Sequence, residues 1–329
     1  MGTIVVAVWL SLACSAGGAD IRLPDGRSCV FADSILGIPV QLQAAEDIAG
    51  RLAASLMLGR DVIGRQEVAV AVSRERVTDI VLKFELPEGR AGVILDCRLE
   101  LVWIDATGRE RATQRQAITI FPPDPFAHRR AWLTRLNLHV YDPDGASLAV
   151  FDALAIPYRR VTNPDALAHT GGGVLIIGEG LSLREHRGLF EIVARAARAG
   201  TPVLMLAPAS GSFRLPGQDD DDAHEKPEAL LLRERDIIRE LDKRFDSAYW
   251  ADGVSVAASR FRLDVHGGRP AFLIDPDHGW SWMELKWEGG RRMSICGFAI
   301  VRDWEASPVP RYLFARMLER VSNQKERER

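Results

Sequence analysis

Five polar side chains between residues 142 and 278 could hold or transfer a proton. They are Asp142, Asp144, Glu179, Ser210 and His278. The first four each follow an apolar segment that is expected to be a buried strand. In open α/β sheets the carboxyl ends of parallel strands meet at one edge, where ligands bind. We therefore expect one candidate pocket formed by these residues, with His278 joining from a later loop. Two carboxylates in one pocket can act as general acid and general base.

Other catalytic patterns are absent from the sequence. It contains no Gly-Xaa-Ser-Xaa-Gly, no His-Glu-Xaa-Xaa-His, no Walker loop and no Cys-Xaa-Xaa-Cys. Gly178-Glu179-Gly180 follows a predicted strand as a phosphate loop would, but it lacks a third glycine and carries a carboxylate, so a tight turn is favoured. Asp219–Asp222, with His224 and Glu225, could attract Ca²⁺. Contiguous aspartates do not converge easily on one ion, so a solvated acidic loop is favoured and no metal or cofactor is expected.

The elements that must position the candidate pocket alternate between strand and helix. Continuous apolar runs at Leu136–Tyr141, Gly173–Gly178 and Pro202–Leu206 are typical of strands buried on both faces. Ser182-Leu-Arg-Glu185 is a capping box before an apolar stripe that ends at Gly200, which predicts a helix. This order requires a mostly parallel, doubly wound sheet of flavodoxin-like type.

Further elements are expected toward the C-terminus. Glu228–Phe245 is predicted as a helix, and two β-hairpins, with turns at His266–Gly268 and Glu288–Gly290, are expected to extend the sheet. A last helix is predicted after Ser307-Pro308.

The first part of the chain has the pattern of an antiparallel β-sandwich. Apolar and polar residues alternate, most clearly in Gly92–Trp103, where Cys97, Leu99, Leu101 and Trp103 share one face. Short strands separated by turns are typical of immunoglobulin-like sandwiches. Ala44–Leu58 fits a short helix or a strand pair equally well.

These patterns predict a multidomain β plus α/β protein. The expected parts are a signal peptide at 1–19, a β-sandwich at 20–120, a proline-rich linker at 121–130, an α/β domain at 131–322 and a charged tail at 323–329. The linker contains three prolines within Phe121–Phe126, which makes it stiff.

The residue pattern at the N-terminus predicts that the protein is exported. An uncharged apolar run, Thr3–Cys14, precedes small residues up to Ala19, which is the pattern of a secretory signal peptide cleaved after Ala19. Leu12-Ala13-Cys14 partly fits a lipidation box, so a lipoprotein anchored through Cys14 remains an alternative. Cys29 and Cys97 could form a disulfide in an oxidising compartment. The sequence thus predicts an exported protein that is periplasmic or associated with the cell envelope, with no transmembrane segment in the mature chain.

The amino-acid composition limits the classes of binding partner that we expect. Lys and Arg number 42 against 45 Asp and Glu, a net charge of −3, so there is no basic excess to neutralise nucleic-acid phosphates. Five of the eight tryptophans lie between Trp250 and Trp304. Aromatic platforms bind sugar rings, but packing in the core or at a domain interface is favoured for these side chains.

The second half of the chain resembles the class I glutamine amidotransferase-like superfamily. The resemblance is carried by Asp142-Pro-Asp-Gly145, by Gly173-Val-Leu-Ile-Ile-Gly-Glu-Gly180, and by Gly200-Thr-Pro-Val-Leu-Met-Leu-Ala-Pro208. It implies a flavodoxin-like fold. In active members, the strand beginning Pro-Val-Leu ends in a turn with a nucleophilic cysteine, and the matching position here is Ala207.

The departures from that pattern predict a catalytically degenerate domain. Alanine cannot attack a carboxamide. The expected His-Xaa-Glu is absent, and His278 and Glu284 are wrongly spaced for it. Cys296 is expected to be a buried apolar thiol. We therefore expect a non-catalytic binding or assembly protein of the cell envelope, whose partner is an envelope protein or a carbohydrate. The alternative is a hydrolase of carbohydrate or another polymer that uses the strand-end carboxylates.

Overall fold

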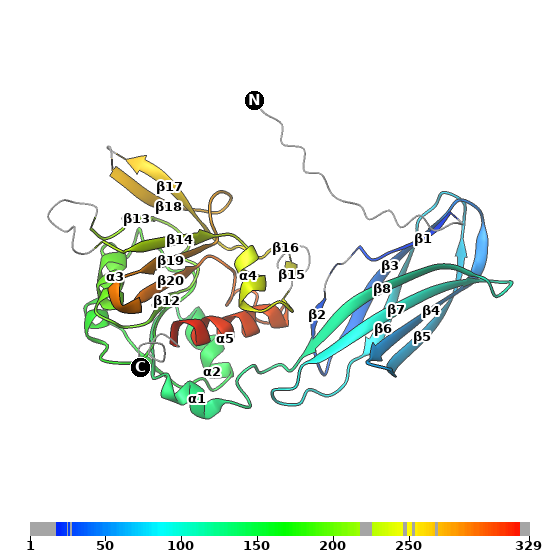
Figure 1. Ribbon diagram of the computed structural model, residues 1–329, viewed down its shortest axis with the longest axis horizontal. Coiled ribbons are helices and arrows are strands. Elements are labelled where there is room, and N and C mark those ends of the chain that lie inside the picture. The colour runs from blue at the N-terminus through cyan, green and yellow to red at the C-terminus, as the bar shows by residue number, and fades with distance from the viewer. Residues whose placement is uncertain are drawn as a thin grey trace. The chain divides into compact units, whose positions relative to one another are not determined.

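The chain folds into two compact units. The computed structural model describes residues 18–24, 26, 28–217, 226–245, 249–251, 254–266 and 269–322. One unit contains residues 1–28, 33–88 and 95–120, and the other contains residues 29–32, 89–94 and 121–329. The fold is rich in β structure, with several separate sheets (Figure 1), which confirms the expectation of a β-rich multidomain protein.

Antiparallel strands make up the first unit. One sheet has the order β1-β3-β6 and another the order β2-β8-β7-β4-β5, of which β2 and the last residue of β8 are counted with the second unit. The strands are β1 (Ala19–Arg22), β2 (Cys29–Phe31), β3 (Ile35–Ala44), β4 (Ile48–Leu58), β5 (Asp61–Val72), β6 (Thr78–Glu85), β7 (Leu95–Asp105) and β8 (Glu110–Phe121). The segment Ala44–Leu58, left open above, therefore forms strand and not helix.

Alternation along β7 produces the buried face expected from the sequence. Cys97 is 6 % exposed, and Leu99, Leu101 and Trp103 are fully buried. Their neighbours on the strand are exposed or half-buried. Because side chains of a strand alternate between its faces, one side of this sheet is core and the other meets solvent.

A seven-stranded sheet forms the centre of the second unit. Its order is β10-β9-β11-β12-β20-β19-β14, and the first five strands are parallel neighbours. The two remaining strands are antiparallel to their neighbours. The strands are β9 (Leu138–Tyr141), β10 (Tyr158–Arg160), β11 (Leu175–Ile177), β12 (Val203–Met205), β14 (Ala229–Arg233), β19 (Trp282–Lys286) and β20 (Arg292–Cys296).

Both faces of this sheet are buried. Alternate residues of the strands pack on one face beside α2 and α5, and on the other beside α3 and η1 (Figure 1). This explains the continuous apolar runs in the sequence, because a strand covered on both faces has no polar side. The helices are α1 (Arg130–Arg135), α2 (Ala146–Ala153), η1 (Pro164–His169), α3 (Leu189–Arg198), α4 (Asp236–Leu241), η3 (Glu288–Gly290) and α5 (Pro308–Ser322).

The connection from β12 to β20 is long and mostly extended. It includes β13 (Ser212–Phe213), β15 (Tyr249–Ala251), β16 (Val254–Ser255), β17 (Arg260–His266) and β18 (Arg269–Asp275). The hairpin β17–β18 forms a separate sheet with β13, whereas the hairpin β19–β20 joins the large sheet. Both hairpins were expected from their turns, but only the second extends the large sheet.

Two helix predictions are wrong in detail. The expected helix at 228–245 is strand β14 followed by the short helix α4. The helix expected from the capping box at Ser182 begins seven residues later, at Leu189. Ser182 Oγ does accept a hydrogen bond from the backbone N–H of Glu185 at 3.3 Å. That bond closes a turn, and Gly188, with φ of 80°, starts the helix.

The segment expected as a linker is packed into the second unit. Phe121 and Phe126 are fully buried in its core. The ring of Phe126 contacts the ring of Phe314 of α5, with 6.2 Å between centroids. Prolines keep this segment extended, but its aromatic side chains are core residues.

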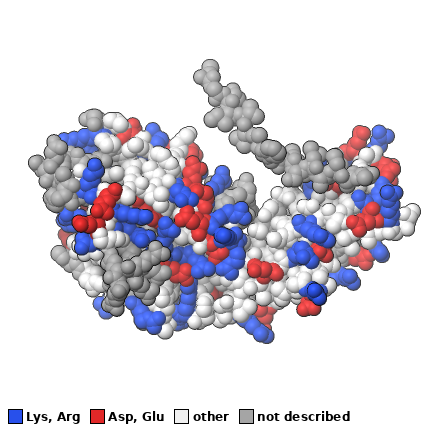
Figure 2. All heavy atoms as spheres, in the orientation of Figure 1, with Lys and Arg blue, Asp and Glu red and all other residues white. Residues whose placement is uncertain are grey.

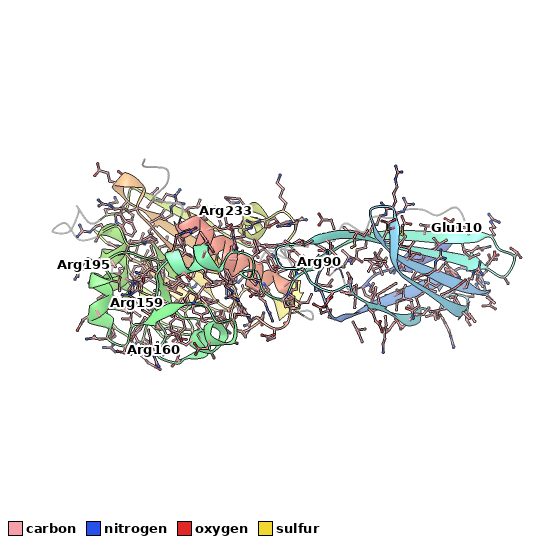
Figure 3. All side chains as sticks on the ribbon, turned by 90° about the horizontal axis from the view of Figure 1, so that it is seen from below. Arg90, Glu110, Arg159, Arg160, Arg195 and Arg233 are labelled. Atoms are coloured by element: carbon pink, nitrogen blue, oxygen red, sulfur yellow. The ribbon has the colours of Figure 1, made fainter. Side chains whose placement is uncertain are left out.

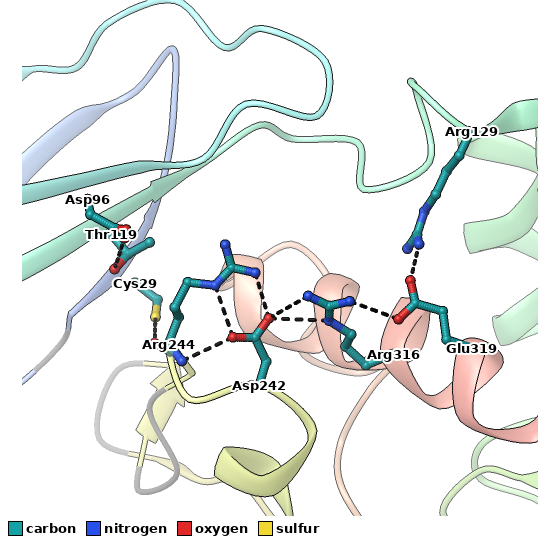
Figure 4. Close-up of polar contacts among 8 residues, drawn as sticks. All are labelled: Cys29, Asp96, Thr119, Arg129, Asp242, Arg244, Arg316 and Glu319. Carbon is teal, nitrogen blue, oxygen red and sulfur yellow. Dashed lines mark hydrogen bonds and ion pairs between the residues drawn. The ribbon is translucent and has the colours of Figure 1, made fainter.

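A chain of charged groups joins α4, α5 and the start of α1 within the second unit (Figure 4). Asp242 accepts hydrogen bonds from Arg244 at 2.6 Å and from Arg316 at 3.0 Å. Arg316 also binds Glu319 at 2.8 Å, and Glu319 binds Arg129. Burial by itself would raise the pKa of Asp242, but the bonds from the two arginines outweigh it and lower that pKa to about 2.

Charges of both signs are interspersed on the visible surface (Figure 2). No helix among the described residues is long and apolar enough to cross a membrane.

Candidate functional site

Asp142 lies directly after β9 and caps helix α2. Its carboxylate accepts hydrogen bonds from the backbone N–H groups of Gly145 at 3.1 Å, Ser147 at 2.7 Å and Leu148 at 3.1 Å. A Cβ at position 178 would lie 2.6 Å from Asp142 Cγ, so Gly178 is needed for this close approach. Asp142 is 3 % exposed, and its oxygens are occupied by the chain itself.

Glu179 lies in the turn after β11 and is also buried, at 8 % exposure. Its Oε2 accepts the N–H of Val301 at 2.6 Å and its Oε1 that of Arg302 at 3.1 Å. Burial raises the pKa of Glu179, and these two N–H groups hold it down in part. The carboxylate ties the end of β11 to the segment that follows β20.

Ser147 connects the carboxylate of Asp142 to the backbone of Glu179. Its backbone N–H binds Asp142, and its Oγ accepts the N–H of Glu179 at 3.0 Å. Asp142 and Glu179 each follow a parallel strand, and Ser147 links the segments that carry them. The sequence did not predict that backbone N–H groups would bind these carboxylates. The Gly178–Gly180 segment is the favoured turn, and a buried anionic side chain lies where a phosphate would need to bind.

Ala207 lies on an extended segment and not on an elbow. The N–H of Leu206 binds the carbonyl of Ile177, the carbonyl of Ala207 accepts the N–H of Gly180 at 2.8 Å, and the N–H of Ala209 binds Leu181 at 2.9 Å. This ladder continues the β11–β12 pairing beyond both strands, to an isolated bridge between Ser182 and Ser210. No helix follows β12 directly, so Ala207 does not lie in a tight turn between a strand and a helix.

The remaining candidate residues are distributed over other positions. Ser210 Oγ donates a hydrogen bond to Ser182 Oγ at 2.9 Å. Asp144 is exposed in the loop before α2. His278 is exposed in the loop between β18 and β19, where its Nδ1 lies 3.6 Å from Asp275. Glu284 is fully buried in β19 and pairs with Arg320 at 2.7 Å.

One exposed group of possible metal ligands surrounds His278. Ligand atoms of Asp275, Asp277 and His278 lie within 4.8 Å of one another. However, Asp275 also binds Arg262 at 3.2 Å, and it accepts the backbone N–H of Asp277. A cation there would compete with the guanidinium, so the group is better explained as a hydrogen-bonded turn.

A polar groove next to Ser210 was not anticipated from the sequence. It has a volume of about 400 Å³. We call it the basic groove. Its rim side chains are Arg184, His186, Arg187, Glu191 and Ser212, and its apolar floor includes Leu183, Phe190 and Leu273. Arg184 and Arg187 form no ion pair with any residue that the structure describes. The only sequence signal was the density of basic residues at 184–187, which the capping box at Ser182 placed in the first turns of a predicted helix.

The floor of the basic groove is firmly held. Phe190 stacks on Phe213, with ring centroids 4.1 Å apart. Gly211 has φ of 110°, and a Cβ there would lie 2.7 Å from the backbone nitrogen of Arg184. His186 Nδ1 lies 3.3 Å from the hydroxyl of Tyr141, at the end of β9. Burial and the nearby Asp144 raise the pKa of Tyr141.

The cysteines carry no disulfide in the described part of the chain. Cys29, Cys97 and Cys296 are all buried thiols, so the pairing of Cys29 with Cys97 considered above is not formed. Cys29 Sγ donates to the carbonyl of Arg244 at 3.1 Å. Burial raises the pKa of Cys97 to about 11 and that of Cys296 further. A raised thiol pKa leaves little thiolate, so neither Cys97 nor Cys296 is a good nucleophile.

Most of the clustered tryptophans are core residues. Trp282, Trp287 and Trp304 are at most 4 % exposed. Trp282 packs on the α5 side of the sheet and Trp287 on the α3 side, so they form no common platform. Trp280 is half-buried beside a second, more open groove with Arg233 and Asp236.

Three expectations concern residues outside the described ranges. The acidic run Asp219–Asp222, with His224 and Glu225, is among them, and so are the apolar run at 3–14 and the charged tail at 323–329. Ala19, after which cleavage is expected, is the first residue of β1 and is buried.

Comparisons with known proteins identify no family. No protein-family profile matches the chain, and no curated protein matches it. Among solved structures, the sporulation control protein Spo0M of Bacillus subtilis is 12 % identical, with a TM-score of 0.27, over 36 % of this chain and 54 % of that one. The match therefore spans about half of that protein.

Two further structures match a similar share of the chain. Fibronectin(III)-like modules of Clostridium thermocellum CbhA are 12 % identical over 32 % of this chain and 97 % of theirs, with a TM-score of 0.22. A Niemann-Pick type C2 protein from the Japanese carpenter ant is 8 % identical over 31 % of this chain and 88 % of its own, with a TM-score of 0.23.

Proposed function

We propose that the chain is an exported, non-catalytic binding or assembly protein of the cell envelope. One observation carries the proposal. At the carboxyl ends of β9, β11 and β12, where an enzyme of this architecture would keep reactive groups, Asp142 and Glu179 are bound by backbone N–H groups and position 207 is an alanine in an extended segment.

The proposal includes two fold assignments. The parallel strands β10-β9-β11-β12-β20 follow the order 2-1-3-4-5 of the flavodoxin-like arrangement, which supports a degenerate amidotransferase-like domain. The two antiparallel sheets of the first unit support an immunoglobulin-like sandwich. Such sandwiches commonly serve as binding or spacer modules on secreted proteins, which fits an assembly role.

A hydrolase acting on carbohydrate or another polymer is less well supported. A general acid–base pair needs two carboxyl groups that reach the substrate. Asp142 and Glu179 are 3 % and 8 % exposed, and each is bound by backbone N–H groups at 3.1 Å or less. Releasing either from those contacts would leave buried N–H groups unpaired.

A glutaminase assay tests the absence of catalysis. We expect purified protein to release no ammonia from glutamine above the buffer rate, before or after treatment with iodoacetamide. Ala207→Cys should also be inactive, because the chain does not turn at this position. Thiol-dependent ammonia release by the unmodified protein, lost in Cys296→Ser, would overturn the proposal.

N-terminal sequencing tests export. Protein recovered from the native host should begin at Asp20 and be found outside the cytoplasm. A lipid-modified Cys14 would identify the anchored form, and cytoplasmic chains that begin at Met1 or Gly2 would contradict export.

A further inference from the structure

We infer that the basic groove binds a small organic anion, one with a phosphate or carboxylate group on an apolar body. The inference rests on the proposed binding function and names the class of ligand. It starts from the contrast between a rigid apolar floor and two rim arginines that have no acidic partner among the residues that the structure describes.

The floor supplies shape and apolar contact. Leu183 and Phe190 are 5 % and 3 % exposed, and Phe190 is fixed by stacking on Phe213. Two backbone bonds hold the walls, from the N–H of Leu183 to the carbonyl of Ser210 and from the N–H of Ile274 to that of Gly211. The apolar base is therefore fixed in shape, and the polar rim side chains surround it.

The rim supplies the charge preference. Arg184 and Arg187 contribute two permanent positive charges against the single carboxylate of Glu191. Neither arginine is held by an acidic partner among the described residues. Guanidinium groups present paired N–H donors that fit carboxylate and phosphate oxygens. The hydroxyl of Ser212 and the ring of His186 add further hydrogen-bonding groups.

The position of the groove agrees with the topology of the sheet. His186 lies 3.3 Å from Tyr141 at the end of β9, and residues 211 and 212 follow β12. The groove therefore lies on the carboxyl side of the parallel strands, where open α/β sheets bind ligands. The approach is open from solvent because Arg184, Arg187 and Ser212 are exposed.

Calorimetric titration of the full chain with matched probes tests the inference. The probes are phenyl phosphate, benzoate, phenol and inorganic phosphate, in low-salt buffer. We expect saturable one-site binding of phenyl phosphate or benzoate, weaker binding of inorganic phosphate, and none of phenol. Affinity should fall as salt rises. Whichever aromatic anion binds more tightly identifies phosphate or carboxylate as the favoured group.

Variants locate the site and reveal its charge preference. Arg184→Gln and Arg187→Gln should each weaken binding roughly tenfold. Glu191→Gln should strengthen binding about two- to fivefold, since it removes from the rim a negative charge that repels the anionic ligand. Arg195→Gln is the matched control, because Arg195 is an exposed arginine of the following helix, α3, that does not line the groove (Figure 3).

Several results would overturn the inference. These are no saturable binding of either aromatic anion, equal binding of phenol, or equal losses in Arg187→Gln and Arg195→Gln. A gain of affinity in Glu191→Gln cannot arise from misfolding, so it separates a true site from a damaged variant. An active glutaminase that binds phenyl phosphate would contradict only the proposed function, and an inactive protein without binding would contradict only this inference.

Discussion

Two clusters of polar side chains in the second unit use their charges in opposite ways. In the Asp142–Ser147–Glu179 cluster, both carboxylates are buried and bound by backbone N–H groups. In the basic groove, Arg184 and Arg187 are exposed and have no acidic partner among the described residues. The first cluster holds the strand ends in place, and the second leaves charge available to a ligand. Residue type at a strand end therefore does not identify chemistry until its hydrogen-bond partners are known.

Among the tests of this comparison, the largest expected loss of stability is in variants of Glu179. Glu179→Ala removes the carboxylate that binds the partly buried N–H groups of Val301 and Arg302, so the free energy of unfolding should fall by roughly 3 kcal/mol. Glu179→Gln should cost less, because its amide oxygen still accepts one bond. Urea denaturation followed by tryptophan fluorescence measures both. Glu185→Ala, an exposed neighbour, is the control, and equal stability of all three variants would remove Glu179 from the structural cluster.

Asp242 extends the comparison to acid pH. Its pKa is about 2 in the folded protein against an ordinary value of 3.8. A lowered folded pKa stabilises the protein above pH 3.8, and that contribution, about 2 kcal/mol, is lost as pH falls from 3.8 to about 2. Asp242→Asn should lose this contribution to the free energy of unfolding at neutral pH. Its stability should therefore fall less steeply than that of the unmodified protein between pH 4 and 2. Asp236→Asn, at a more exposed pair with Arg233, should leave the acid profile unchanged.

A smaller loss is expected at Asp142. Removing the carboxylate in Asp142→Ala takes away the cap of α2 and should cost roughly 1–2 kcal/mol in urea denaturation. Asp144→Ala, two residues away and exposed, should change stability by less than about 0.5 kcal/mol. If both variants lose the same amount, Asp142 has no special structural role.

The smallest effect on stability is expected in the basic groove. Arg184→Gln and Arg187→Gln should each change the free energy of unfolding by less than about 0.5 kcal/mol, since these arginines are exposed and have no ion-pair partner in the described ranges. A loss comparable to that of Asp142→Ala, measured under the same conditions, would show that the groove arginines support the fold and would end the contrast between the two clusters.

The sequence predicted the strands better than the contacts between distant segments. The alternation of apolar and polar residues predicted which face of β7 is buried. Continuous apolar runs predicted β9, β11 and β12. Both signals are local in the sequence. The helix expected at 228–245 was wrong because Ala229–Arg233 is apolar enough for either structure, and pairing with β19 decides for strand. Capping at Ser182 formed as predicted, but Gly188 set the start of α3.

The candidate pocket stays a prediction, and the structure shows where its residues lie. The positions of Asp142 and Glu179 at strand ends followed from the pattern of the chain. The N–H groups that bind Glu179 come from residues 301 and 302, more than a hundred positions away, and no local signal reveals them. The basic groove was missed for the same reason, since residues 211, 212 and 273 complete it.

The pairing of β12 with β20 has a consequence for how the protein is made. Residues 203–205 lie beside residues 293–295, and everything between them must emerge before this pair can form. During synthesis, β9, β11 and β12 therefore wait with one sheet edge unpaired and without α5 covering one of their faces. Unpaired strand edges and uncovered apolar faces promote aggregation, and contacts between distant residues form slowly. Whether the chain emerges from the ribosome or from an export channel, the second unit passes through a vulnerable interval that ends only when α5 has emerged and packed onto the sheet.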